Sequence, residues 1–167
     1  MIEFINVSKR FGSKVVLHQV EFTIKEGETF VIIGQSGAGK TTILRHIAGF
    51  FDPDKGDVLV EGDKMNGARS SVRASIREKM GFLFQSGALI NWLNVRDNIA
   101  LPLVEHRLGT KEEIDKIVDD RLKKLQLSDA ADKMPSDISG GMKKRAGLAR
   151  AIVRNPRIIL YDEPTSG

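Results

Sequence analysis

Apolar and polar residues alternate along the first part of the chain. Ile2 to Val7 alternates with a period of two, Val15 to Ile24 does so less regularly, and Asp57 to Gly62 is a further such run that follows a turn. Successive side chains of a β-strand point to opposite faces, so this period is typical of strands with one solvated face. The pattern predicts three antiparallel strands in the N-terminal part of the chain.

Three short runs are apolar without alternation. They occupy residues 29–33, 80–84 and 157–161, and they are rich in Ile, Val, Leu and Phe. Continuous apolar runs of this length indicate strands buried on both faces of a parallel sheet. Residues 42–48 after the first run predict a helix that stops at Gly49, and residues 68–79 predict a second helix with a polar face. The pattern therefore predicts an α/β domain.

The middle of the chain, from Ser86 to Asp137, has a helical pattern. We expect one helix over Val95 to Glu105, bent or ended by Pro102, because proline lacks a backbone donor. Thr110 and Glu113 have the spacing of a capping box at the start of another helix. That helix has an apolar stripe for core packing, formed by Ile114, Ile117, Val118, Leu122 and Leu125.

Composition excludes several kinds of chemistry. The 167 residues contain no cysteine, so disulfides, thiolate metal sites and a cysteine nucleophile are excluded. No secretory signal and no apolar run long enough to span a membrane is found. The net charge of +4 is too small to require a nucleic-acid partner. Part of it lies in Lys143-Lys144-Arg145 and the following Arg150 and Arg154, which we interpret as a solvated helix face. Contact with anionic lipid headgroups or phosphates is the alternative.

The segment from Gly34 to Thr42 carries the strongest chemical signal. It fits G-x-x-x-x-G-K-[ST] between a predicted strand and a predicted helix, the arrangement of a phosphate-binding loop. Glycines let backbone amides turn toward phosphate oxygens, Lys40 adds a full charge, and the Thr41 hydroxyl can reach Mg²⁺. An ordinary glycine-rich turn is the alternative. The predicted nucleotide-binding residues are Gly34, Ser36, Gly37, Ala38, Gly39, Lys40, Thr41 and Thr42.

Two further motifs acquire meaning beside this loop. Asp162 and Glu163 follow the apolar run 157–161, where α/β sheets bind ligands; Asp162 can hold Mg²⁺ and Glu163 can polarise the attacking water. A strand-end turn would also explain them. Ser139 can cap a helix that runs to about Arg154, and the glycines after it suit a second anion-binding helix terminus. Because the chain already has one phosphate loop, a partner chain could complete this second site.

The ordered set of motifs resembles the ATP-binding-cassette (ABC) ATPases over essentially the whole chain. The resemblance implies a P-loop α/β fold with a central parallel sheet, an N-terminal antiparallel β subdomain and an inserted helical subdomain. It implies ATP and Mg²⁺ bound between two head-to-tail cassettes, with a homodimer expected. It assigns Phe11 to adenine stacking, although a partly buried strand-turn Phe is the alternative, and it assigns Gln85 to Mg²⁺ and water sensing. The residues that would meet the γ-phosphate of the other subunit are Ser139, Gly140, Gly141 and, less conventionally, Met142.

A narrower resemblance lies in residues 84–89 and 93–100, which look like the Mce-associated lipid-transport ATPases, including those that maintain lipid asymmetry. In that family the region corresponding to residues 86–104 faces an integral membrane permease. The implied location is cytoplasmic, on the inner face of the cell membrane through the permease. Trp92 with Leu89, Ile90 and Leu93 could form the docking patch, or these residues could simply pack the helical lobe.

We expect one incomplete cassette domain over 1–167: a nucleotide-binding core at 1–85, a helical subdomain at 86–138 and a signature helix with the acidic strand at 139–167. The family's further aspartate loop, last strands and γ-phosphate histidine do not appear. None of His18, His46 and His106 suits that role. Without the missing strand, backbone hydrogen-bonding groups of its neighbouring strands would lack partners, which makes a stable monomer doubtful. We therefore expect either a fragment, or strand edges that are covered by domain swapping or oligomerisation.

Three functions follow. The first is an ATPase subunit that energises a membrane transporter, for lipid. The second is a nucleotide-binding module that cannot turn over as it stands, suggested by the missing motifs. The third is a soluble cassette protein that acts on nucleic acid or ribosomes, which the positive net charge suggests. We nevertheless expect no nucleic-acid partner.

Overall fold

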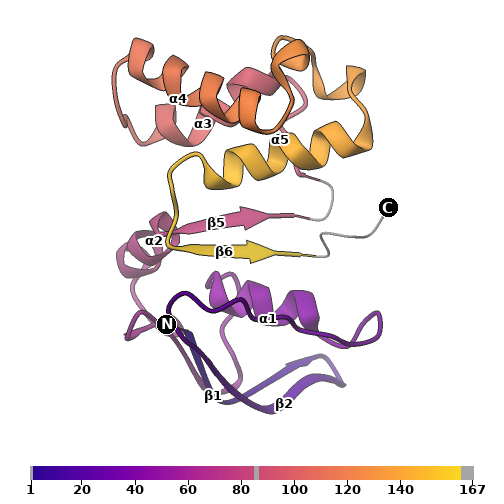
Figure 1. Cartoon of the computed structure of the whole chain (residues 1–167). Coiled ribbons are helices and arrows are strands. Elements are labelled where there is room, and N and C mark those ends of the chain that lie inside the picture. The colour runs from indigo at the N-terminus through magenta and orange to yellow at the C-terminus, as the bar shows by residue number, and fades with distance from the viewer. Residues whose placement is uncertain (1, 85–86, 163–167) are drawn as a thin grey trace. The chain divides into compact units, whose positions relative to one another are not determined.

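The computed structural model describes residues 2–84 and 87–162. The chain divides into two compact units, residues 1–78 and 79–167, which are described separately below (Figure 1). The three-part division at residues 85 and 138 stays a prediction. Within the described residues, no helix is both long and apolar enough to cross a membrane.

The first unit contains a four-stranded antiparallel sheet in the order β2-β1-β3-β4. Phe4 of β1 lies opposite Phe22 of β2 on one side and opposite Val58 of β3 on the other. The alternating pattern therefore predicted these strands correctly, although β1 extends further than its alternation. The strands are β1 (Ile2–Phe11), β2 (Lys14–Ile24), β3 (Lys55–Val60) and the short β4 (Asp63–Lys64).

Helix α1 (Lys40–Ile47) packs near this sheet, and α2 (Ser70–Glu78) closes the unit; both confirm helices expected from the sequence. The predicted stop of α1 is also confirmed. Gly49 has a φ of 67°, its N–H donates to the His46 carbonyl, and the Phe50 N–H donates to the Arg45 carbonyl at 2.8 Å. These paired bonds satisfy carbonyls that the helix end would otherwise leave open.

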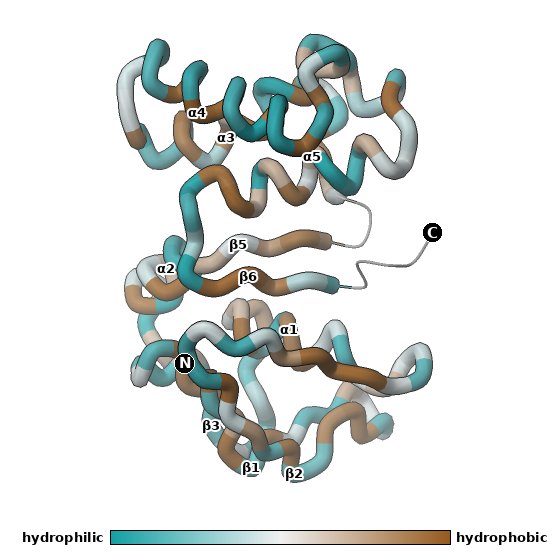
Figure 2. The backbone as a smooth tube through the Cα atoms, in the orientation of Figure 1, coloured by the Kyte–Doolittle hydropathy of each residue, from teal (hydrophilic) through white to brown (hydrophobic). Residues whose placement is uncertain are grey.

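The strand predicted at residues 29–33 is wrong. The segment is not a strand, and all of its side chains except the partly buried Ile32 are exposed: Val31 is 70% exposed and Ile33 is 90% exposed. Figure 2 shows it as a brown, hydrophobic run before α1. Apolar, β-branched composition favours a strand, but a strand also needs a neighbouring backbone, and none of the described strands pairs with this segment. Only Phe30 finds aromatic packing there, stacked on Phe22 with ring centroids 5.0 Å apart.

The second unit contains two parallel strands, β5 (Met80–Leu83) and β6 (Ile158–Tyr161), in the register Met80↔Ile158. Both were predicted from apolar runs. Helix α5 (Gly140–Ile152) contacts β5 on one side and the helices α3 (Val95–Glu105) and α4 (Lys111–Lys124) on the other, so it forms the middle layer of this unit (Figure 1). Two short 3₁₀ turns, at Ser128–Ala130 and Pro135–Asp137, connect α4 to α5.

The helical layer has its own apolar core, which includes Val95, Ile99, Val118 and Leu122. The predicted capping box is present: the Glu113 N–H donates to Thr110 Oγ1 at 3.3 Å, and the Thr110 N–H donates to Glu113 Oε2 at 2.8 Å. Three of the five stripe residues are buried, while Ile117 and Leu125 are partly buried against the same core. The helix expected over Val95 to Glu105 is confirmed; of the two roles expected for Pro102, ending the helix is wrong, because α3 continues past it to Glu105.

Candidate nucleotide-binding site

The loop before α1 is shaped by two glycines with left-handed backbone. Gly37 has a φ of 79° and Gly39 a φ of 96°, a region that other residues enter only at a cost. Space restricts Gly39 further: a Cβ there would lie 3.0 Å from Leu17 Cδ2 and 3.1 Å from the Val16 carbonyl oxygen. Packing against β2 and local conformation therefore both require glycine at this position.

The loop leads directly into the N-terminus of α1, which has no side-chain cap. Gly39 is the N-cap and makes no side-chain hydrogen bond, and the first turn holds no acidic residue. The first backbone N–H groups of a helix have no intrahelical acceptor and carry partial positive charge. A glycine cradle with this terminus fits phosphate oxygens, and it carries no negative charge that would oppose them.

Lys40 adds a full positive charge at the same place. Its ammonium donates to the carbonyl oxygens of Gly34 and Gln35, each at 2.9 Å. The side chain thus lies folded over the loop that would surround a phosphate chain. Ser36, Ala38, Thr41 and Thr42 complete the predicted set on the loop and first turn; Ser36 and Ala38 are exposed, and Thr41 and Thr42 are partly exposed.

Phe11, the predicted adenine platform, is the last residue of β1 and is 44% exposed. Its ring meets the edge of Phe51, with centroids 5.4 Å apart and planes at 68°. The Lys9 ammonium lies 5.6 Å from the same ring centroid. The ring therefore has fixed neighbours and still keeps accessible surface.

The second glycine-bearing helix start belongs to α5. Ser139 is its N-cap, and Ser139 Oγ accepts a hydrogen bond from the Met142 N–H at 3.2 Å. Ser139, Gly140 and Gly141 are exposed, and a Cβ on Gly140 would meet nothing within 4 Å. Met142 is half-buried against the core of the helical layer. The surface formed by residues 139–141 is therefore open to a partner.

The carboxyl ends of β5 and β6 lie side by side. The Asp162 N–H donates to the Leu83 carbonyl at 3.0 Å, which places Asp162 beside the last residue of β5. Ligands of α/β proteins bind at such ends. The predicted Gln85 and Glu163 follow these two positions closely in sequence, but both lie outside the described residues.

A buried polar contact in the second unit was missed by the sequence analysis. Asn98 of α3 is fully buried; its Oδ1 accepts from the Ile90 N–H at 2.7 Å, and its Nδ2 donates to the carbonyls of Ile90, Leu93 and Asn94. Asn98 is the one polar residue among the buried positions of α3, which are otherwise Val95, Ile99 and Leu103, and its place at this helical spacing was the available signal.

Arg150 joins this network from α5. Its Nη2 donates to the carbonyls of Gly87 and Ala88 at 3.0 and 2.8 Å, and burial lowers the pKa of the guanidinium. The interpretation of Arg150 as part of a solvated face is therefore wrong. Together the two side chains hold the loop 87–94 against α3 and α5. On that loop Trp92 is 79% exposed, while Leu89 packs against the helical core, so only part of the predicted docking patch is open.

The chain belongs to the ABC transporter family, whose model matches residues 17–166. It is 42% identical over 166 residues to the "Probable ribonucleotide transport ATP-binding protein mkl" of Mycobacterium tuberculosis, covering 99% of this chain and 46% of that protein. It is 40% identical over 174 residues to "Protein TRIGALACTOSYLDIACYLGLYCEROL 3, chloroplastic" of Arabidopsis thaliana, covering 50% of that protein. The chain thus spans about half the length of these relatives.

Other relatives and solved structures agree on the fold. The glutamine transport ATP-binding protein GlnQ of Escherichia coli is 41% identical over 166 residues, which cover 69% of it. The dimeric structure of the ATP-binding cassette MJ0796 bound to ADP and phosphate superposes with a TM-score of 0.90 at 37% identity, covering 99% of this chain and 75% of that one. These matches confirm the ABC ATPase form of the P-loop fold expected from the sequence.

Proposed function

We propose that this protein binds Mg·ATP at residues 34–42 and hydrolyses it as the ATPase subunit of a membrane transporter. The observation that carries the proposal is the phosphate cradle: two left-handed glycines, an α1 terminus without a side-chain cap, and Lys40 folded over the loop. Membership of the ABC transporter family and the likeness to a cassette with bound ADP and phosphate support it.

Each site residue then has a separate task. Lys40 and the loop amides bind the triphosphate, and Phe11 stacks on the base. Thr41, Gln85 and Asp162 would hold Mg²⁺, which neutralises phosphate charge when bound. Glu163 accepts a proton from water as the water oxygen bonds to the γ-phosphorus and the bond to ADP breaks.

A second copy of the chain would complete the site. Residues 139–142 are exposed or half-buried, and the α5 terminus carries partial positive charge. We propose that this terminus binds the γ-phosphate held by the opposing loop, so that hydrolysis requires a dimer. The dimeric solved structure of MJ0796 supports this arrangement.

We further propose a lipid as the transported molecule. The support is the resemblance of residues 84–89 and 93–100 to lipid-transport ATPases, together with the Arabidopsis relative, which is named after a galactolipid. Residues 86–104, with the exposed Trp92, would meet a permease and hold the ATPase at the inner face of the membrane. Relatives named for ribonucleotide, glutamine and polyamine transport supply the competing substrates.

The test of hydrolysis is the ATPase rate of the purified protein with and without Glu163→Gln. We expect a fall of at least about 100-fold, because a general base contributes 10²–10⁴-fold. Glu21→Gln, at an exposed position of β2, is the matched control and leaves the rate unchanged. Equal rates in the two variants would remove Glu163 from the mechanism.

The test of substrate uses vesicles that contain the ATPase with its co-purified membrane partner. ATP-dependent movement of a fluorescent phospholipid, absent in Glu163→Gln, is expected. Movement of a ribonucleotide, glutamine or a polyamine in place of the phospholipid would contradict the lipid assignment while leaving the ATPase assignment intact.

A further inference from the structure

Three aromatic rings form a series in the first unit. The Phe11 ring meets Phe51 at 5.4 Å between centroids, and Phe51 meets the His46 ring at 6.1 Å with planes at 66°. Both contacts have edge-to-face geometry, which aromatic pairs prefer. The series runs from the end of β1, across the segment after α1, to α1 itself.

His46 fastens one end of this series to the phosphate loop. Its ring is 1% exposed, and its Nδ1 lies 2.7 Å from the carbonyl oxygen of Thr42, the last residue of the loop motif. A ring nitrogen can meet a carbonyl only as a donor, so Nδ1 carries the proton in this contact. The ring position is therefore tied to the first turn of α1.

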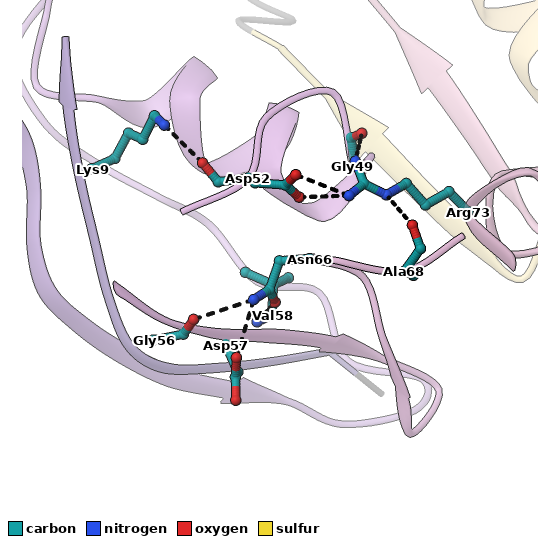
Figure 3. Close-up of polar contacts among 9 residues, drawn as sticks. All are labelled: Lys9, Gly49, Asp52, Gly56, Asp57, Val58, Asn66, Ala68 and Arg73. Atoms are coloured by element: carbon teal, nitrogen blue, oxygen red, sulfur yellow. Dashed lines mark hydrogen bonds and ion pairs between the residues drawn. The ribbon is translucent and has the colours of Figure 1, made fainter. Parts of the chain in front are cut away.

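The residues that follow Phe51 are held on both sides, and the contacts of Asp52 are drawn in Figure 3. The Lys9 ammonium donates to the Asp52 carbonyl at 2.8 Å. It also donates to Asp54 Oδ1 at 2.9 Å. Arg73 Nη2 donates to both carboxylate oxygens of Asp52, at 2.8 and 2.9 Å. The Arg10 N–H donates to Asp54 Oδ2 at 2.7 Å, so the backbone beside Phe11 is tied to the same segment.

These contacts fix Phe51 relative to the strand that ends at Phe11. Phe51 itself is half-buried, and the Arg45 guanidinium lies 5.7 Å from its ring centroid. The ring contacts β1 and α1, and the adjoining Asp52 is bonded to Arg73 of α2, so the ring cannot follow Phe11 if Phe11 turns. It therefore restricts the orientation of the exposed Phe11 ring, and a platform that is already oriented loses less entropy when a ligand stacks on it.

We propose that Phe51 is a positioning residue for the nucleotide base: it orients the Phe11 ring and, through His46, sets its spacing from the phosphate loop. The proposal rests on the proposed function, in which Phe11 stacks on the base and residues 34–42 bind the phosphates. A change at Phe51 should therefore weaken the binding of a nucleotide but not the binding of a triphosphate that has no base.

The experiment compares Mg·ATP with magnesium tripolyphosphate by calorimetry on the whole protein. Phe51→Leu should weaken ATP binding about three- to tenfold, the range expected for losing one aromatic pair, and leave tripolyphosphate binding unchanged within twofold. Phe51→Tyr keeps the ring edge and should restore ATP binding. In a Phe11→Ala background, Phe51→Leu should cause no further loss, because it acts through Phe11.

Phe50→Leu is the matched control. Phe50 is the neighbouring ring, it is 51% exposed, and it has a comparable cation contact with Arg77 at 5.9 Å. It should leave the binding of both ligands unchanged.

Three results would overturn the inference: equal loss of ATP and tripolyphosphate in Phe51→Leu, the same ATP affinity in Phe51→Leu as in Phe50→Leu, or a full additional loss in the Phe11→Ala background. Should Phe51→Leu fail to fold, Phe51→Met replaces it, alone and in the Phe11→Ala background, and is judged by the ratio of its ATP and tripolyphosphate affinities. Failure of the wild-type protein to bind either ligand would contradict the proposed function itself.

Discussion

Two helices of this protein start at glycines, and they differ in how the start is built. Helix α1 has Gly39 as its N-cap in a left-handed conformation and makes no side-chain cap bond, whereas α5 has Ser139 as a capping residue in an extended conformation. Gly39 is enclosed by β2, whereas a Cβ on Gly140 would meet nothing within 4 Å and one on Gly141 would meet Arg145 Nη1 at 3.9 Å, an ordinary contact. Glycine therefore allows a tightly packed loop before α1 in one unit, and it leaves an accessible surface at the start of α5 in the other.

The difference shows what each terminus can do alone. At α1 the loop, Lys40 and the helix end belong to one continuous segment, so the elements of a phosphate site are local. At α5 the serine satisfies one amide, and no comparable loop wraps the terminus among the described residues. We therefore expect α1 to bind a ligand within one chain, and α5 to contribute only when a second chain approaches.

The largest expected effect comes from comparing two single glycine substitutions, one at the start of each helix. Gly39→Ala should reduce the free energy of unfolding by about 3 kcal/mol, because it adds left-handed strain and crowds Val16 and Leu17. Gly141→Ala should raise it by about 0.5 kcal/mol, since alanine suits a helix better. Chemical unfolding measures both, and equal effects would contradict the enclosed-versus-open distinction.

A smaller effect is expected at the buried amide that fixes the loop beside α5. Asn98→Ala should cost about 2 kcal/mol, because it leaves the buried Ile90 N–H without its acceptor. Asn94→Ala, which removes only the N-cap of the same helix, should cost about 1 kcal/mol. Urea unfolding followed by Trp92 fluorescence compares them, and a smaller loss in Asn98→Ala than in Asn94→Ala would contradict the network.

The two capping residues of the second unit sharpen the comparison further. Ser139→Ala and Thr110→Ala each remove a side-chain cap and should each cost about 1 kcal/mol in unfolding free energy. Only Ser139→Ala should also lower the ATPase rate, because only that terminus is proposed to reach the partner's phosphate. A similar fall in rate for Thr110→Ala would show that the loss comes from stability alone.

The smallest effect is the pH dependence of stability that arises from His46, which is buried on α1. Burial, as the leading cause, lowers the pKa of His46 below its ordinary value of 6.5; the hydrogen bond to the Thr42 carbonyl opposes the shift, Lys9 adds to it, and Asp52 also opposes it. The unfolded chain therefore takes up the proton first as pH falls below 6.5, so stability is full above that pH and declines below it. Wild-type protein should lose under about 1 kcal/mol more than His46→Leu between pH 7.5 and 5.5 in thermal unfolding.

The sequence predicted those elements whose causes are local. The alternating strands, the Thr110–Glu113 box, the Gly49 stop and the Ser139 cap depend on residues a few positions apart, and the structure has all of them. The left-handed glycines of residues 34–42 likewise depend on a local motif, while phosphate binding by that segment stays a prediction.

Long-range contacts could not be predicted in this way. The exposure of residues 29–33 depends on whether another strand pairs with them, which composition does not reveal. Arg150 looked like surface charge because Asn98 and Gly87 lie 52 and 63 positions away in sequence. The Phe11–Phe51–His46 series likewise joins positions that no spacing rule connects.

The most direct test of the central claim is a calorimetric titration of Mg·ATP into the protein and into Lys40→Ala. The loop is proposed to bind the triphosphate, so the wild-type protein should bind and Lys40→Ala should bind at least about tenfold more weakly, as expected for a lost charge-assisted hydrogen bond. Lys116→Ala, at an exposed position of α4, should bind like the wild type. Absence of heat with the wild type, or equal affinities for Lys40→Ala and Lys116→Ala, would contradict the account.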